Sequence, residues 1–356
     1  MFKIKPLVAA ILTVVSVQTY AAGNTSIQDQ DGIDNQANVL QTGGEENMAE
    51  QIQAGTLNTA ETEQTASENT DSVISQNGVY NYAESVQTNS RWSSAAQYQE
   101  GAENTSVVTQ ENSDGDVALI EQVGDLNMAS IFQSNSSDSS ARIIQEGDYN
   151  TALVAQDGEG HDAYSSTTGS DNRLYTQQSG IGQQAVVFQD GTANRVTTYQ
   201  DGTDNRTLTE QTGEYNAAFI DQNGIGQVAE LAQSGDTNDG YVTQSGNFNE
   251  LYFDQSGNDN LLLADQIGND NLITGQSNGS YNTVDVIQNG ELNTAAVNQL
   301  SGADNLATVL QTGNGNLADI TQAGTANEAI INQSGMNNSA YISQSNSGNM
   351  ATVTQR

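Results

Sequence analysis

Apolar and amide side chains occupy alternate positions in short blocks that repeat along almost the whole chain. In one block Asn316, Ala318, Ile320 and Gln322 form one set, and the residues between them are mixed and partly charged. Alternation with a period of two is typical of a β-strand that has one face turned inward. Each block therefore predicts a strand of five or six residues whose Asn, Ala, aliphatic and Gln side chains point to the same side.

A glutamine recurs at steps of 11 or 12 residues from Gln30 to Gln355 and usually opens the phrase Q-x-G-x-x-N-x-A-x-x-x-Q. A fixed short period indicates stacked units, each too small to bury a hydrophobic face alone. We predict that the repeated positions form ladders of identical side chains along the stack. Two complete copies supply the ladder residues Gln145, Gly147, Asn150, Ala152 and Gln156, and Gln211, Gly213, Asn216, Ala218 and Gln222.

The step lengths predict how the units are built. Steps alternate between 11 and 12 residues as far as Gln156 and then stay at 11 as far as Gln299, so that two steps make a coil of 22–23 residues. Each half is a strand followed by an arc of four or five residues, and the Gly after each Gln lies at the bend because glycine tolerates a positive φ. The predicted fold class is all-β: a β-solenoid of two-strand arches in about 14–15 coils, forming a rod of roughly 70 Å.

The composition fits a stack of polar ladders better than a large hydrophobic core. Apolar residues make up 35 % of the chain, below the usual share of about 45–50 %. Composition alone predicts disorder, but amides at fixed spacing can satisfy one another as ladders. The chain has no cysteine, and its one proline is Pro6, which leaves the repeats free of a residue that strand interiors exclude.

The chain is predicted to divide into three segments. Residues 1–22 are typical of a secretory signal peptide, with Lys3 and Lys5 ahead of an apolar stretch and a cleavage site after Ala21 or Ala22. Residues 23–29 are interpreted as a short polar lead-in without the motif, and residues 30–356 as the repeat solenoid. The apolar stretch is too short for a permanent membrane span.

Removal of the signal peptide would leave six arginines against 44 Asp and Glu, a formal charge of −38. Nucleic acid and anionic membranes are therefore poor partners. The simplest role of the acidic residues is to keep a self-associating secreted chain soluble.

The longest form of the repeat resembles the curlin repeat, S-x5-Q-x-G-x-x-N-x-A-x3-Q, of the curli amyloid subunits of Gram-negative bacteria. Ser139, Gln145, Gly147, Asn150 and Gln156 carry it, and the likeness covers nearly all of the chain after residue 22. The resemblance implies a secreted subunit of an extracellular, cell-surface fimbrium that serves adhesion and biofilm formation. It also implies a nucleator and a secretion and chaperone machinery as partners. The closing residues 352–356 resemble the end of the minor nucleator, which remains the alternative to a major subunit.

Self-assembly is the predicted function, and the end coils are the predicted active surface, because an uncapped strand edge is a template for the next chain. The partner is then a second copy of the same chain. The residues expected at the two ends are Gln30, Asn35, Val39 and Gln41, and Gln333, Asn338, Ile342, Gln344 and Gln355.

Other functions have weaker support. Acidic arcs such as residues 201–205 resemble calcium ligands, but their Asp positions vary and a calcium β-roll has a period of nine. An ice-binding solenoid needs a regular Thr face, which the chain lacks. The only histidine, His161, stands in place of a repeat Asn, and Thr167 in place of a repeat Gln, so both are interpreted as degenerate copies that break the ladder. We expect no enzyme activity, cofactor or metal site.

Overall fold

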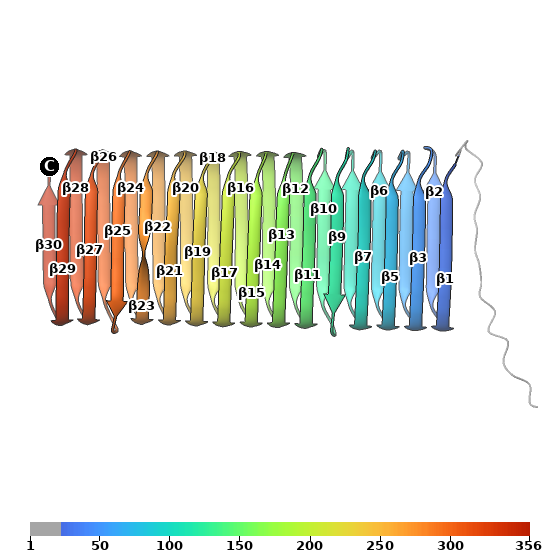
Figure 1. Ribbon diagram of the computed structural model, residues 1–356, viewed down its shortest axis with the longest axis horizontal. Coiled ribbons are helices and arrows are strands. Elements are labelled where there is room, and N and C mark those ends of the chain that lie inside the picture. The colour runs from blue at the N-terminus through green and yellow to red at the C-terminus, as the bar shows by residue number, and fades with distance from the viewer. Residues whose placement is uncertain (1–22) are drawn as a thin grey trace, which may run out of the picture.

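The computed structural model describes residues 23–356, which form one flattened rod of parallel strands with the first and last coils at opposite ends (Figure 1). Two sheets of 15 strands each make up the rod, one from the odd-numbered and one from the even-numbered strands. Each coil contributes one strand to each sheet. The predicted β-solenoid of about 14–15 coils is confirmed, whereas the predicted signal peptide lies outside the described residues.

The odd-numbered strands form the first sheet, in which every strand pairs in parallel with the one from the next coil. Their bounds are β1 Thr25–Ile33, β3 Met48–Thr56, β5 Asp71–Val79, β7 Ser94–Ala102, β9 Val117–Val123, β11 Ser140–Asp148, β13 Asp162–Ser170, β15 Gln184–Thr192, β17 Arg206–Glu214, β19 Val228–Asp236, β21 Glu250–Asn258, β23 Leu272–Ser280, β25 Thr294–Ser301, β27 Leu317–Thr325 and β29 Ser339–Ser347.

The even-numbered strands form the second sheet in the same way. Their bounds are β2 Gln36–Thr42, β4 Thr59–Thr65, β6 Tyr82–Thr88, β8 Thr105–Glu111, β10 Met128–Ser134, β12 Thr151–Glu159, β14 Arg173–Ile181, β16 Arg195–Thr203, β18 Ala217–Ile225, β20 Asp239–Asn247, β22 Leu261–Asn269, β24 Thr283–Glu291, β26 Leu306–Asn314, β28 Glu328–Met336 and β30 Met350–Gln355.

The strands are longer than the sequence suggested. β11 pairs with β13 over nine residues, so the ladder continues through Gln145, Glu146 and Gly147 and leaves only two residues between β11 and β12. The first strand also begins at Thr25, inside the segment interpreted as a lead-in, and pairs with β3. Both differences have one cause. The strand pairing starts five residues before each repeat Gln and continues past it, whereas the prediction ended each strand at its Gln and began the first unit at Gln30.

The inward parity of the repeat is as predicted. Asn316, Ala318, Ile320 and Gln322 are all fully buried inside the rod, the first in the turn and the others between the sheets, and the residues that alternate with them lie on the outer face. Stacked sheets approach to about 10 Å, which leaves room for one layer of small and aliphatic side chains. Each buried aliphatic side chain contributes about 1.5–3 kcal/mol.

The glycine two residues after each Gln is required for two reasons: its backbone has a positive φ, and the backbone of the next coil approaches it closely. Gly147 has a φ of 113°, and a Cβ added there would lie 2.1 Å from the carbonyl oxygen of Gly169 in the next coil. Any other residue would have to push the two coils apart. These glycines therefore belong to the ladder and do not simply form a bend.

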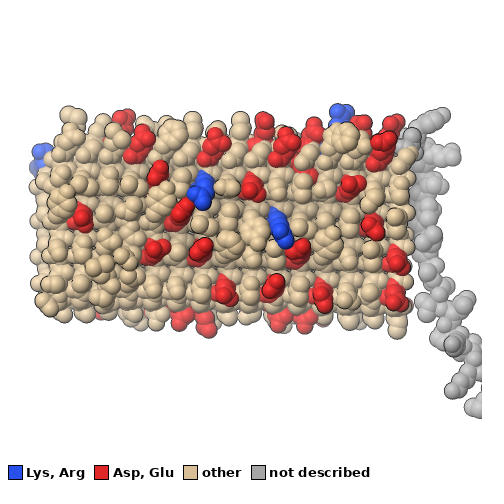
Figure 2. Space-filling view, viewed as in Figure 1, with Lys and Arg blue, Asp and Glu red and all other residues tan. Residues whose placement is uncertain are grey.

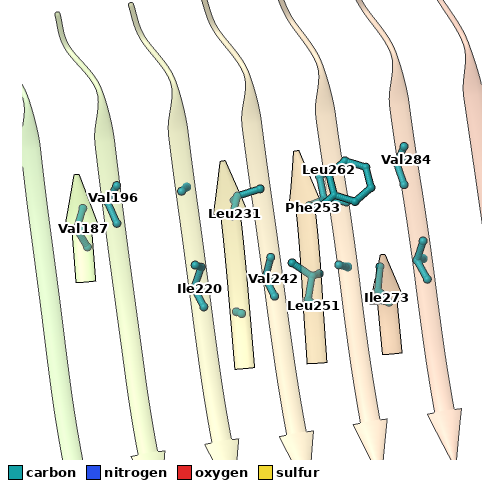
Figure 3. Close-up of a cluster of buried hydrophobic side chains, with 14 of the residues drawn as sticks. Val187, Val196, Ile220, Leu231, Val242, Leu251, Phe253, Leu262, Ile273 and Val284 are labelled. Atoms are coloured by element: carbon teal, nitrogen blue, oxygen red, sulfur yellow. The ribbon is translucent and has the colours of Figure 1, made fainter. Parts of the chain in front are cut away.

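Large and small residues exchange places inside the C-terminal half of the rod, in the region where Figure 3 shows Phe253 beside Leu262. The usual order along a strand is Ala and then a larger residue. In β23 the order is reversed, with Ile273 followed by Gly275. A Cβ on Gly275 would lie 1.9 Å from the carbonyl oxygen of Val297 in the next coil and 2.9 Å from the ring of Phe253 in the preceding coil, so the backbone approaches closely there and the ring takes up side-chain volume. The core keeps its density by compensation between coils.

Candidate functional site: the amide ladders and the open ends

One glutamine ladder runs unbroken through the whole even-numbered sheet. It begins at Gln41 and ends at Gln355, with a glutamine in every strand from β2 to β30. In each consecutive pair the Nε2 of one glutamine donates to the Oε1 of the glutamine in the next coil, at 2.7–3.0 Å. All bonds point the same way, so the ladder has a donor end and an acceptor end.

The glutamine ladder of the odd-numbered sheet is interrupted twice. Thr167 pairs with Gln145 and Gln189 in the strand register but bonds to neither, and Oε1 of Gln189 is buried with no partner. Ser277 takes the second place, and its hydroxyl donates to Oε1 of Gln299 at 2.8 Å. The prediction that Thr167 breaks the ladder is therefore correct, whereas Ser277 preserves one side of it.

An asparagine ladder follows one edge of the rod, in the turns that lead from odd to even strands. It runs from Asn35 to Asn349 without substitution, and each Oδ1 accepts the backbone N–H of the asparagine in the next coil at 2.9–3.2 Å. The Nδ2 groups donate to the repeat glycines, as from Asn150 to the carbonyl of Gly169 at 2.8 Å. Each asparagine thus ties three consecutive coils together.

The opposite edge accepts substitutes because several side chains can replace the asparagine as an acceptor. The Oδ1 of Asp116 accepts the N–H of Ser139 at 2.9 Å, and the Oγ of Ser139 accepts the N–H of His161 at 3.1 Å. The Nδ1 of His161 then accepts the N–H of Gln183 at 3.3 Å. The interpretation of His161 as a break in the ladder is wrong, since its unprotonated nitrogen does what an asparagine oxygen does elsewhere.

Two ionisable groups are fully buried in this edge. Burial raises the pKa of Asp116 above its ordinary value and lowers the pKa of His161, because both side chains are taken out of water. For His161 the neutral form is also the one whose Nδ1 can accept a hydrogen bond.

The residues predicted for the ladders lie where the stack needs them. Gln156 and Gln222 are members of the even ladder, and Gln145 and Gln211 of the odd ladder. Asn150 and Asn216 belong to the asparagine edge, and Gly147 and Gly213 have φ values of 113° and 116°. Ala152 and Ala218 are buried.

The two ends of the rod leave complementary groups without partners in the chain. At the C-terminal end Gln344 and Gln355 each donate one Nε2 hydrogen to a backbone carbonyl, and no further glutamine lies above them. At the N-terminal end Gln30 and Gln41 donate into the stack, and no donor within residues 23–356 reaches their Oε1 atoms. One end therefore presents amide donors where the other presents amide acceptors.

The turns at the two ends complement each other in the opposite sense. At the C-terminal end the Oδ1 atoms of Asn338 and Asn349 are free to accept a backbone N–H from a further coil. At the N-terminal end the backbone N–H groups of Asn24 and Asn35 are free to donate to an Oδ1 of a preceding coil. The Nδ2 of Asn24 is buried and has no hydrogen-bond partner within the described chain.

Not every residue predicted for the ends lies at an end. Gln333 is fully buried in β28, one coil inside the edge, and donates to Gln355 at 2.8 Å. Val39 and Ile342 do belong to the end coils. The prediction missed Asn24 and Asn349, which extend the two turn ladders. Asn24 could have been found because it lies 11 residues before Asn35.

Comparison with known proteins supports the same repeat. A family model described as the curlin associated repeat matches residues 136–164, 279–313, 293–324, 313–345 and 324–356. These segments are curlin associated repeats, and they support the assignment of the chain to the curlin family. A comparison with curated proteins found no match.

The surface of the curlin repeats is strongly acidic, and Figure 2 shows carboxylates spread over the visible face and both edges. Three ion pairs form among residues 23–356, and each joins neighbouring coils: Arg91 with Glu68 at 3.6 Å, Arg142 with Glu121 at 3.1 Å and Arg206 with Glu230 at 2.9 Å. All three are exposed, so each adds little to stability.

The described curlin repeats show no group of three or more His, Asp or Glu side chains that could hold a metal ion. In the same part of the chain, no helix has the length and apolar character needed to cross a bilayer.

Proposed function

We propose that the chain is the subunit of a curli-type extracellular amyloid fibre that grows end to end, by strand stacking between copies. The observation that carries this proposal is the pair of open ends. β29 and β30 each have a neighbour on one side only, and so do β1 and β2. An uncapped strand edge recruits another strand, and here both edges present the same repeat.

Hydrogen bonds at the joint would reproduce those inside the rod. The Nε2 of Gln344 and Gln355 would donate to Gln30 and Gln41 of the next copy, as every glutamine does within the even ladder. The Oδ1 of Asn338 would meet the N–H of the next copy's Asn24 and also its Nδ2, which has no partner in the single chain. Buried amides that remain unbonded are costly, so docking relieves groups at both ends.

The role within a fibre follows from the same ends. Because both are open, a copy can add to a copy indefinitely, which favours the bulk subunit over the minor nucleator. Secretion through the predicted signal peptide, a place in a cell-surface fimbrium, and use in adhesion and biofilm matrix are parts of the proposal that rest on family membership. The acidic surface supports it further, since it keeps single rods apart.

The test blocks one end without disturbing the rod. The N–H groups of Leu317 and Glu328 donate to the last coil at 2.8 and 2.7 Å, so the equivalent N–H groups of β29 and β30 face the open edge. Successive residues alternate in direction, which places the N–H of Tyr341 and Thr352 there too. Replacing both by proline removes two edge donors and no existing ladder bond.

The double variant Tyr341→Pro, Thr352→Pro should elongate fibre seeds at least tenfold more slowly. Added in small amounts to the unaltered chain, it should also stop growth, because its N-terminal end still docks. The control variant Tyr341→Ser, Thr352→Ser loses the same side chains and keeps both donors. Elongation by the proline variant at the rate of this control would overturn end-to-end growth.

A further inference from the structure

Four tyrosines form a regular row along one edge of the rod. Tyr80, Tyr149, Tyr215 and Tyr281 each occupy the turn between an odd and an even strand, next to an asparagine of the unbroken ladder. Their exposed fractions are 57, 55, 59 and 60 %. They follow β5, β11, β17 and β23, which places one tyrosine in every third coil. At the strand spacing of a sheet, neighbouring rings are about 14 Å apart.

The fold does not require tyrosine at these four places. Their φ values of 57–60° lie in the left-handed region that bulky residues avoid. The equivalent position on the opposite edge is often glycine, as at Gly160, Gly182 and Gly226. The same left-handed turn occurs at the equivalent place of other coils, as at Leu57, Leu126 and Ala193, so the fold accepts different residues there and does not select tyrosine. Since the rings are exposed, burial in this rod does not repay the strain.

Carboxylates surround the row. The turn residue one coil after Tyr80 is Glu103, and those after Tyr149 and Tyr281 are Asp171 and Asp304. Asp148 and Glu214 directly precede Tyr149 and Tyr215. These five carboxylates are exposed. Arg173 and Arg195 begin the strands that follow this edge in the gap between Tyr149 and Tyr215.

We propose that this tyrosine row is a docking surface for an extended polypeptide rich in lysine and arginine. Cationic side chains lie over exposed aromatic rings by cation–π attraction, and the neighbouring carboxylates add charge complementarity. A second copy of this chain would bring carboxylates against carboxylates. A folded partner would find a narrow edge, whereas an extended segment can follow the row.

The row sets the length of the ligand. Tyr80 and Tyr281 are separated by nine coil steps, or about 43 Å, which an extended peptide of about 13 residues spans. A peptide of about four residues reaches from one ring to the next. The row also continues in phase along an end-to-end fibre, because 15 coils are a multiple of three. Only this extension rests on the proposed function, since a single rod carries the whole row.

The test measures oligolysine binding to single immobilised rods of residues 23–356, in about 1 M salt, where the Debye length of about 3 Å suppresses general attraction to an acidic chain. The row variant replaces Tyr80, Tyr149, Tyr215 and Tyr281 by Asn, which suits the left-handed turn and leaves the charge unchanged. The control replaces four exposed tyrosines of the strand faces by Thr, namely Tyr98, Tyr199, Tyr241 and Tyr341.

The row variant should bind a peptide of about 13 lysines at least tenfold more weakly, because linked contacts multiply, and one of about four lysines only slightly more weakly. The control should stay within twofold of the unaltered chain. A third variant, Tyr215→Ala with Ala193→Tyr, moves one ring by one coil and should lose part of the length dependence. Equal weakening by row variant and control would overturn the proposal. So would row-dependent binding of a neutral β-glucan or a glucosamine oligomer in place of oligolysine. Failure of fibre growth would leave this assay intact, so the two proposals can fail separately.

Discussion

The first four coils and the last six share one backbone plan but have different interiors. In the N-terminal block, residues 25–111, the larger inward position of the strands holds Gln51, Thr62, Ser85 and Gln97 as well as Ile74 and Val108. In the C-terminal block, residues 228–355, aliphatic side chains such as Val297, Val309, Ile320 and Ile331 fill the equivalent places. The even-sheet glutamine ladder and the asparagine ladder from Asn35 to Asn349 pass through both blocks unchanged. The backbone and amide ladders therefore define the shape of the coil, while the interior side chains determine its local stability.

Much of the polar interior is satisfied locally, whereas the buried Oγ of Ser85 has no hydrogen-bond partner within the described residues. The Nε2 of Gln51 donates to the Oγ1 of Thr62 at 3.0 Å and to the carbonyl of Asn38 at 2.8 Å, and Thr62 lies 3.3 Å from the hydroxyl of Ser72. Such bonds exchange contacts with water for contacts with protein and add only about 0.5–1.5 kcal/mol each. We therefore expect the N-terminal block to open more readily than the C-terminal block.

The largest expected effect is common to both blocks. Gly78→Ala and Gly313→Ala place a Cβ 1.9 and 2.0 Å from the carbonyl oxygen of the next repeat glycine. Each should reduce the local free energy of opening by more than about 4 kcal/mol, as measured by amide hydrogen exchange of the two coils. The control is Gly160→Ala, where the nearest atom is 4.0 Å away and only the positive φ costs, about 1 kcal/mol. A mild effect in one block alone would show that the blocks do not share the glycine ladder.

A middle-sized effect should separate the blocks. Ile320→Ala removes a fully buried side chain and should cost about 2–5 kcal/mol. Thr62→Ala in the polar block should cost about 1 kcal/mol, since Gln51 keeps its bond to Asn38. Hydrogen exchange in the affected coil measures both. Equal costs would mean that the two interiors stabilise the rod to the same degree.

The smallest expected effect lies between the blocks and depends on pH. Burial holds the pKa of His161 below its ordinary value of 6.5, so the unfolded chain takes up the proton first. Stability from this group is complete above pH 6.5 and is lost as the pH falls below it, because protonated Nδ1 can no longer accept the N–H of Gln183. His161→Asn should abolish that loss, which we expect to be about 1–3 kcal/mol, the cost of an unpaired buried group.

The same acidification should act in the opposite direction in the C-terminal block. Burial raises the pKa of Asp239, Asp265 and Asp285 above 3.8. Their charged forms disfavour folding, and this penalty is relieved as the pH falls through their raised pKa values. Hydrogen exchange followed from pH 7 downward should show the coils around His161 losing protection first. Uniform protection at every pH would refute both assignments.

Much of this fold follows from the sequence for a simple physical reason. A strand has a period of two, and a stack repeats its units, so Asn316 to Gln322 already indicate which side chains face inward. What the sequence did not reveal is which side chains are equivalent. His161 and Asn205 have different side-chain chemistry, yet each accepts the backbone N–H of the equivalent residue in the next coil, Gln183 and Gln227 respectively.

The arcs within the 12-residue steps show the same limit of prediction from sequence. Their extra residue reads as a looser bend, but Ser67 and Ser90 are buried there and donate to the carbonyls of Gln87 and Gln110 at 3.0 Å. The exchange of volume between Phe253 and Gly275 was also invisible, because the two residues are neighbours only through the stack. For the open ends, the repeat predicted the glutamines but not that Gln333 lies one coil inside.

Uniform spacing of a single label along the fibre tests the central claim most directly. Because the chain has no cysteine, Trp92→Cys gives one exposed attachment point for a heavy-atom cluster, three coils inside the N-terminal end. If copies stack head to tail, labels in electron micrographs should repeat evenly at about 72 Å, the length of 15 coils at the strand spacing. Alternating short and long spacings would mean head-to-head joining, and irregular spacings would mean that the ends are not the joint. Either result would contradict the account.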